Sequence, residues 1–354
     1  MKTYPFLYLL VFLTPILVVF SLSSTGIFSF STVAVLFVIL PAIELFTVGS
    51  TYNLTKEEEL FALDNRLYDL ILYSLVPIQY AILVYFLVKI GNSDSDLITQ
   101  IGYTTAYGMS CGILGINAAH ELGHRHTWYE QWMSKSLLLT TLYMHFFIEH
   151  NRGHHRRVST MEDPASARYG ENVYAFHLRS IKGSWLSAWQ LERQKLDKNG
   201  HSYWSLHNEM LIFQGLQILL VICIYLVFGG FVLLWFLSSA IIGIFLLETV
   251  NYIEHYGLQR KSINGKYERT MPIHSWNSNH PFGRLILLEL SRHSDHHYMA
   301  NRKYQILRHF DESPQMPTGY PGMMVLSLIP ILWFKVMHKQ IAKYKSTSEG
   351  MNLA

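Results

Sequence analysis

Nine of the eighteen histidines in the chain fall into short groups with close spacings. Imidazole nitrogen binds iron, zinc, copper and nickel, so groups of this kind predict a metal site. Residues four apart share one face of a helix, which would let His120 and His124 bind one ion, and likewise His150 and His154. Nine imidazoles exceed the roughly four ligands of a tetrahedral zinc and therefore predict two metal ions. The candidate ligands are His120, His124, His150, His154, His155, His255, His293, His296 and His297.

Four acidic residues lie directly beside these histidines: Glu121, Glu149, Glu254 and Asp295. A metal-binding histidine usually donates its second ring proton to a carboxylate or carbonyl, which fixes its tautomer. Adjacent residues of a helix point about 100° apart, so each acid is expected to serve a histidine of another group. We expect at least two of the four acids to hydrogen-bond a metal-binding histidine.

The elements that must position these residues are apolar. The chain has 354 residues, of which 50% are hydrophobic and 15% charged, compared with about 25% charged in soluble domains. Apolar runs long enough to cross a bilayer predict six membrane helices and an all-α, polytopic membrane fold. The runs cover residues 5–23, 28–48, 68–90, 99–119, 210–228 and 231–250.

The polar segments between these runs carry every histidine and most of the positive charge. Residues 119–209 and 251–354 together have eight more Lys and Arg than Asp and Glu, whereas the rest of the chain has five fewer. The positive-inside rule places such segments in the cytoplasm. The expected organisation is residues 1–118 with membrane helices one to four, 119–209 with the first two histidine groups, 210–250 with helices five and six, and 251–354 with His255 and the last group. The two polar segments are expected to form a histidine-rich helical cap that holds a di-metal site.

The two cysteines, Cys111 and Cys223, lie in apolar runs. They are too few for an iron–sulfur or rubredoxin-type site, which needs about four thiolates. A redox reaction would therefore draw its electrons from a separate protein. Zinc has no redox chemistry, whereas a pair of irons with nitrogen ligands can bind dioxygen and attack an unactivated C–H bond.

The sequence around the histidines resembles that of the integral-membrane di-iron alkane monooxygenases, which belong to the membrane fatty acid desaturase and hydroxylase superfamily. The resemblance covers about residues 100–325. The Asn-Tyr-Ile-Glu-His-Tyr-Gly and Pro-Thr-Gly-Tyr-Pro elements favour this branch over desaturases and over sterol or lipid hydroxylases. Beyond the histidine groups, the stretches that carry the resemblance are Glu162-Asp-Pro-Ala-Ser-Ala-Arg168, Asn251-Tyr-Ile-Glu-His255-Tyr-Gly-Leu258 and Pro314-Gln-Met-Pro-Thr-Gly-Tyr-Pro321.

The resemblance implies that the nine histidines bind two iron ions and that the early membrane helices line a substrate tunnel. It also implies that one oxygen atom of O2 is inserted at the terminal methyl group of a medium- or long-chain alkane, giving a primary alcohol. The electrons would come from rubredoxin, itself reduced by a rubredoxin reductase. The protein would lie in the bacterial inner membrane with its site facing the cytoplasm, and no catalytic residue is expected beyond the metal ligands.

Three other interpretations are open at this point. A related hydrocarbon or lipid hydroxylase or desaturase, such as an aromatic methyl hydroxylase, would share the histidine groups. The segment from His120 to His124 also matches the His-Glu-x-x-His signature of zinc proteases, with Glu121 as base, but this leaves seven histidines unused. A metal transporter would be expected to have carboxylates inside its spans, and only Glu44 and Glu248 lie there.

The remaining basic and histidine residues have weaker interpretations. Arg152, Arg156 and Arg157 could dock an acidic electron carrier, although the positive-inside rule alone predicts the same excess of charge. The other nine histidines are interpreted as structural. Among them, His145 and His280 are the two most expected to have a further role near the site. These nine are His126, His145, His177, His201, His207, His274, His280, His309 and His338.

Overall fold

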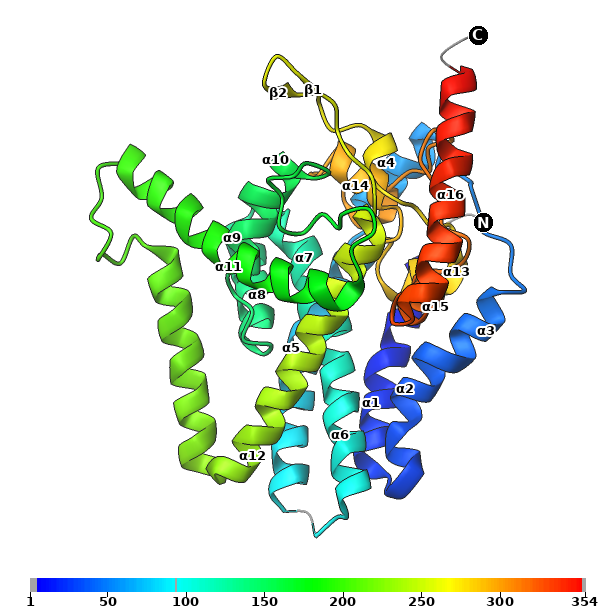
Figure 1. Ribbon diagram of the computed structural model, residues 1–354. Coiled ribbons are helices and arrows are strands. Elements are labelled where there is room, and N and C mark those ends of the chain that lie inside the picture. The colour runs from blue at the N-terminus through cyan, green and yellow to red at the C-terminus, as the bar shows by residue number, and fades with distance from the viewer. Residues whose placement is uncertain (1–4, 93, 352–354) are drawn as a thin grey trace.

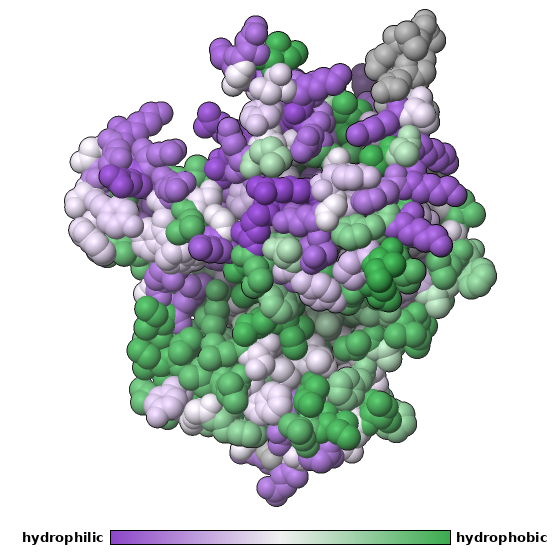
Figure 2. Space-filling model, viewed as in Figure 1, coloured by the Kyte–Doolittle hydropathy of each residue, from purple (hydrophilic) through white to green (hydrophobic). Residues whose placement is uncertain are grey.

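The structure is a computed structural model that describes residues 5–92 and 94–351. It is mostly helical, with a bundle of long helices at one end and a cap of short helices and loops at the other (Figure 1). On the face shown in Figure 2, hydrophobic residues cover the bundle and hydrophilic residues dominate the cap. A bilayer around the bundle requires this distribution. The helical membrane architecture predicted from the sequence is therefore present.

The first half of the chain contains η1 (Pro5–Phe12), α1 (Leu13–Ser23), η2 (Gly26–Phe30), α2 (Ser31–Ala34), η3 (Val35–Ile39), α3 (Leu40–Glu44), α4 (Lys56–Asp64), α5 (Leu67–Gly91), α6 (Leu97–Ser110), η4 (Cys111–Asn117), α7 (Ala118–Gly123), α8 (Trp128–Leu139), α9 (Phe146–Glu149), η5 (His150–His154) and α10 (His155–Arg157). The second half contains α11 (Val173–Lys198), α12 (Glu209–His255), β1 (Ser262–Ile263), β2 (Lys266–Tyr267), η6 (Pro272–His274), α13 (Pro281–Ile286), α14 (His293–Tyr298), η7 (Tyr304–Ile306), α15 (Tyr320–Ser327) and α16 (Pro330–Met351).

Four helical segments in the described residues are long and apolar enough to cross a membrane, where the sequence predicted six. One reason for the difference is the apolar run 99–119, which is divided among α6, the π-helical segment η4 and α7. A second reason is that the runs 210–228 and 231–250 are joined in α12. The four segments are Pro5–Ser23, Gly26–Glu44, Leu67–Gly91 and Glu209–His255.

Helix α12 is 47 residues long and bends sharply at Gly229. At 1.5 Å per residue, a straight helix of that length would be about 70 Å long, more than twice the thickness of a bilayer core. Gly229 has φ 82° and ψ 173°, a conformation that is essentially restricted to glycine. The two arms form a V in Figure 1, and the second arm returns to the cap with His255 at its end.

The second arm of α12 packs tightly against α6 and η4, which carry the chain toward His120. A Cβ atom on Gly108 would clash with Ile242, and one on Gly112 would clash with Leu246. Small residues four apart let membrane helices approach closely, because their van der Waals packing replaces the hydrophobic driving force that lipid removes. This contact fixes the end of α12 that carries His255 relative to the first histidine group.

A small hairpin stands out from the cap (Figure 1). Its strands β1 and β2 are antiparallel, with Ser262 paired with Tyr267. The two turn residues, Asn264 and Gly265, have φ values of 53° and 75°. An Asn-Gly pair with positive φ is the turn preferred in two-residue hairpin loops, because its twist matches that of the strands.

Candidate metal centre

The first histidine group lies on α7, immediately beyond the apolar helix formed by α6 and η4. His120 is buried and His124 is half-buried. Their ring centroids are 5.0 Å apart, and both side chains belong to a cluster of five histidines whose ring nitrogens all lie within 4.8 Å of one another. The pairing expected from helical spacing is therefore present in this group.

The second group divides between two clusters, which differs from the expected pairing of His150 with His154. His150 and His155 belong to the five-histidine cluster, with their Nε2 atoms 3.0 Å apart. His154 belongs to a second cluster of four histidines. The segment η5 is a π-helix, in which residues five apart come into register. The local winding of the backbone thus replaces the four-residue pairing with a five-residue pairing.

The last group divides in the same way. On α14, His293 and His297 belong to the four-histidine cluster, whereas His296 belongs to the other. His255, at the end of α12, completes the second cluster. The five-histidine cluster is His120, His124, His150, His155 and His296, and the four-histidine cluster is His154, His255, His293 and His297.

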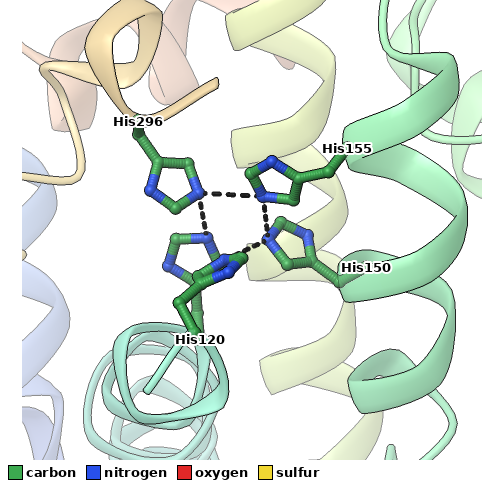
Figure 3. A group of neighbouring side chains, drawn as sticks. His120, His150, His155 and His296 are labelled. Carbon is green, nitrogen blue, oxygen red and sulfur yellow. Dashed lines mark hydrogen bonds between the residues drawn. The ribbon is translucent and has the colours of Figure 1, made fainter. Parts of the chain in front are cut away.

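All nine rings present Nε2 to their cluster. Neighbouring Nε2 atoms are 2.9 to 3.2 Å apart, and Figure 3 shows His120, His150, His155 and His296 converging on one point. Ligands at about 2.1 Å from one ion and at right angles to each other are about 3.0 Å apart. The spacing and the donor type therefore fit one metal ion in each cluster.

Burial keeps these imidazoles neutral, the form that binds metals. Burial, together with the nearby His154 and Arg125, lowers the pKa of His124 to about 3. Burial is also the largest cause of pKa values well below the usual value at the other rings outside the membrane helices, and again neighbouring histidines add to it. These rings are His120, His150, His155, His293, His296 and His297.

His154 is the exception, because it has a carboxylate partner that the sequence analysis did not single out. Its Nδ1 lies 2.8 Å from Oδ2 of Asp163, and both residues are buried. Burial alone would lower the pKa of His154, but the Asp163 carboxylate raises it above the usual value. Asp163 is held in turn by the Ser166 hydroxyl at 2.6 Å. In the sequence, Asp163 was marked only by its place in the stretch Glu162–Arg168, which carries part of the family resemblance.

The two acids of the first and last groups face away from the clusters. Glu121 pairs with Arg125 at 2.7 Å and accepts a hydrogen bond from the backbone N–H of Tyr304. Asp295 pairs with Arg302 at 2.5 Å. The Glu121 carboxylate is therefore not placed as the base of a zinc protease, and neither acid orients a histidine ring of the clusters.

The other two acids contact a clustered histidine, but in a different manner from that expected. Glu149 accepts a hydrogen bond from the backbone N–H of His154, not from its ring, and pairs with Arg157 at 2.5 Å. Glu254 lies 3.2 Å from Nε2 of His293, which is the nitrogen that faces the cluster. Fixing a tautomer through Nδ1 is the role of Asp163 instead.

A strained turn sets the position of the last histidine group. Leu288 and Glu289 have φ values of 51° and 60°, a left-handed conformation that costs free energy outside glycine and persists where surrounding contacts impose it. Glu289 pairs with Arg284 at 2.7 Å and accepts a hydrogen bond from Tyr8 at 2.8 Å. The first helix of the chain therefore helps to hold α14 in place.

An apolar cavity lies in the bundle and ends at both clusters. Its walls include His120 and His150 of the five-histidine cluster and His293 of the four-histidine cluster. Most other lining side chains are aliphatic, for example Leu36 from η3 and Met324 from α15. A cavity of this character suits a hydrocarbon chain, because it offers no hydrogen bonds along most of its length.

The five-histidine cluster also approaches the polar surface. His124 lines an open depression together with Arg125, His126 and Asn151. Among the arginines considered for docking a carrier, Arg152 pairs with the buried Glu192 at 2.8 Å, whereas Arg156 is exposed. Arg152 therefore already forms an ion pair inside the protein.

His145 and His280 were the two histidines outside the groups that were most expected to have more than a structural role. Both make ordinary contacts with neighbouring side chains. His145 is buried with its ring centroid 4.3 Å from that of Tyr143, and Nδ1 of His280 lies 3.0 Å from the Ser278 hydroxyl. Neither belongs to the two histidine clusters found among the described residues.

A bundle of apolar helices with two buried histidine clusters at its polar end defines a membrane protein with a di-metal site. The fatty acid desaturase family matches residues 98–327. Alkane 1-monooxygenase 1 of Alcanivorax borkumensis is 40% identical over 326 residues, 91% of this chain and 80% of the relative. An alkane 1-monooxygenase of Pseudomonas putida is 39% identical over 336 residues, 94% of this chain and 83% of the relative. The chain belongs to the alkane 1-monooxygenase family, within the fatty acid desaturase superfamily.

A more distant relative is named for a different substrate. The hydroxylase component of a xylene/toluene monooxygenase from Pseudomonas putida is 28% identical over 321 residues, 89% of this chain and 81% of the relative.

Proposed function

We propose that this protein hydroxylates the terminal methyl group of medium- or long-chain alkanes to primary alcohols, with O2 as co-substrate and rubredoxin as electron donor. The observation that carries the proposal is the apolar cavity that ends at His120, His150 and His293. It connects a space suited to a hydrocarbon with both histidine clusters. The identity of about 40% to alkane 1-monooxygenases over most of the chain supports the same reaction.

The nine clustered histidines would hold two iron ions, five ligands for one and four for the other. When bound, the two irons supply the redox chemistry with dioxygen that zinc lacks. Overall, one O2, two electrons and two protons convert R–CH3 to R–CH2OH and water. The two electrons require a separate carrier, because the chain has only two cysteines, Cys111 and Cys223.

The side chains of the cavity would align the substrate and exclude water. Leu36, Ile113 and Leu246 belong to its apolar wall. Polar groups are found near the clusters, where Asn117 donates a hydrogen bond from its side chain to the Leu287 carbonyl. An alkane inside the cavity can therefore place a terminal carbon near the clusters with the rest of its chain among aliphatic side chains.

We further propose six membrane crossings and a site that faces the cytoplasm of a bacterial inner membrane. Each arm of α12 would cross once, and the continuous α6–η4–α7 segment would supply another crossing besides the first three. Residues 1–118 would then hold helices one to four, 119–209 and 251–354 the cytoplasmic cap, and 210–250 helices five and six. The excess of positive charge in the two cap segments supports this orientation.

The proposal is tested by product analysis in whole cells that express the chain with rubredoxin and rubredoxin reductase. Alkanes of graded length should yield primary alcohols, and none should form without rubredoxin. Cells that contain the protein and both partners but form no alcohol from any alkane would overturn the proposal.

Substitution in the cavity sharpens this experiment. Leu36→Phe should shift the preference toward shorter alkanes by roughly 10-fold, since overpacking an enclosed apolar site costs about 1–3 kcal/mol. Val38 on the same helix is 63% exposed, so Val38→Phe is the matched control and should leave the preference unchanged. Equal length profiles for both variants would show that the substrate does not occupy this cavity.

Hydroxylation of an aromatic methyl group is a second candidate, favoured by the 28% identical xylene/toluene monooxygenase component. Toluene and xylenes fed to the same cells test it. Benzylic alcohols formed faster than alkanols would make the aromatic substrate the primary one.

A further inference from the structure

Glu254 is a buried carboxylate beside the four-histidine cluster, and no Lys or Arg among the described residues forms an ion pair with it. It precedes His255 on α12 and is 1% exposed. Oε2 lies 3.2 Å from Nε2 of His293, and Oε1 has no hydrogen-bond partner among the residues described. The Tyr320 hydroxyl interacts with this carboxylate but adds no positive charge. An ionised carboxylate in an apolar site is strongly unfavourable unless a cation lies beside it, and without a cation the group takes up a proton.

The acids that neighbour the other histidine groups have such a cation. Glu121 has Arg125 at 2.7 Å, Glu149 has Arg157 at 2.5 Å, and Asp295 has Arg302 at 2.5 Å. Within the described part of the chain, Glu254 instead contacts the imidazole of His293, which is neutral. A positive charge beside Glu254 would therefore come from something other than Lys or Arg.

The position of Glu254 indicates a metal ion as that charge. Nε2 of His293 also lies 2.9 Å from Nε2 of His297 and 3.2 Å from Nε2 of His255, so it points to the centre of its cluster. A nitrogen that binds a metal has no proton to donate to a carboxylate. The 3.2 Å contact instead matches the spacing of neighbouring ligands around one ion, about 3.0 Å. We infer that Glu254 is an additional ligand of the metal ion held by the four-histidine cluster.

The carboxylate would approach this ion from the cavity side, because Glu254 and His293 line the apolar cavity together. Its oxygen is not one of the atoms that all lie within 4.8 Å of one another in the cluster, so it extends the ligand set toward the substrate. Each ion would then have five protein ligands. The anionic oxygen of Glu254 would belong only to the ion of the four-histidine cluster. The negative charge would stabilise the more oxidised state of that ion relative to its neighbour. This inference rests on the proposed di-iron centre.

The test compares iron content and Mössbauer spectra of purified wild-type protein, Glu254→Gln and Glu254→Ala, all loaded with the Mössbauer-active isotope. The wild type should hold about two irons per chain, and Glu254→Ala about one, because loss of a ligand weakens the site strongly. Glu254→Gln keeps the size of the side chain and should change the signal of one iron and leave the other as in the wild type. Glu248→Gln is the matched control: its carboxylate is also buried on α12 but accepts a hydrogen bond from Tyr143 at 2.8 Å, and both iron signals should be retained.

Two irons with both signals unchanged in Glu254→Gln and Glu254→Ala would overturn the assignment and leave the proposed function intact. Loss of both irons from Glu254→Gln would also overturn it, since the role inferred is confined to one cluster. A wild-type protein that binds fewer than two irons would overturn the proposed function and this inference together.

Discussion

The second and last histidine groups contribute to both clusters, whereas the first group belongs to the five-histidine cluster alone and His255 to the four-histidine cluster alone. The surroundings of the two clusters differ as well. In the five-histidine cluster, His124 and His155 are half-buried, and His124 lines a depression that opens at the surface. In the four-histidine cluster every ring is buried. The buried cluster has two carboxylates against its rings, Asp163 and Glu254. One cluster is thus close to solvent, and the other is enclosed by protein.

This difference suggests a division of roles between two sites that share one cavity. Electron transfer from a separate carrier is favoured where a metal site approaches the surface, which here is the side of His124 and His155. An enclosed site is better suited to controlling the charge of its ion, because carboxylates interact more strongly with it away from water. The predictions below test this contrast.

The largest effects are expected from removing one ligand of each cluster. His255→Ala and His296→Ala should each reduce hydroxylation by at least about 100-fold, more than the 10–100-fold typical of losing a residue that only orients a ligand. Iron analysis should show that each variant has lost the ion of its own cluster. His201 is exposed and distant in sequence from the groups, so His201→Ala is the control. Full turnover in either cluster variant would contradict its assignment as a ligand.

A smaller effect is expected from the hydrogen bond that orients His154. Asp163→Asn should lower the affinity of the four-histidine cluster for iron by roughly 10–100-fold, because a neutral amide replaces the charged acceptor that fixes the tautomer of the His154 ring. Titration with a chelator measures this affinity for each ion separately. Glu162 is exposed next to Asp163, so Glu162→Gln should have no effect. Equal weakening of both ions by Asp163→Asn would show that the carboxylate acts on the fold and not on one cluster.

The smallest effect is expected at the surface of the five-histidine cluster. Arg156 is exposed and follows His155 directly, so Arg156→Glu should slow electron transfer from rubredoxin several-fold, as changes of charge at the rim of an interface do. Raising the ionic strength should slow the wild type and reduce the difference between the two proteins. Lys198→Glu, at the far end of α11, is the matched control. A salt-independent rate would contradict electrostatic docking at this surface.

Much of the site could be predicted from the sequence, because ligand type and helical spacing are local properties. The grouping of nine histidines and their separation from the apolar runs predicted a di-metal site at one end of a helical bundle, and the two clusters confirm that the groups converge. Local spacing was misleading for His150 and His154, because the π-helical winding of η5 pairs His150 with His155 instead. Asp163 gave no signal of its own, since nothing in its sequence neighbourhood shows that it meets His154.

The membrane helices, too, could be predicted only in part from the sequence. Composition identified every apolar run, because transfer of side chains from water to lipid depends on each segment alone. The bend at Gly229 falls in the gap between the runs 210–228 and 231–250, whereas nothing in the composition of the run 99–119 indicated its division among α6, η4 and α7.

By itself, the sequence determined which residues can bind metal, which segments belong in a bilayer and which family the chain resembles, because these follow from the chemistry of side chains and their local order. Only the tertiary structure decided which histidine joins which cluster, that Asp163 contacts the ring of His154, and that Glu254 lies against His293 without an arginine beside it. Those outcomes depend on contacts between segments up to about 180 residues apart, such as the 2.9 Å approach of His120 to His296, and no local pattern encodes such contacts.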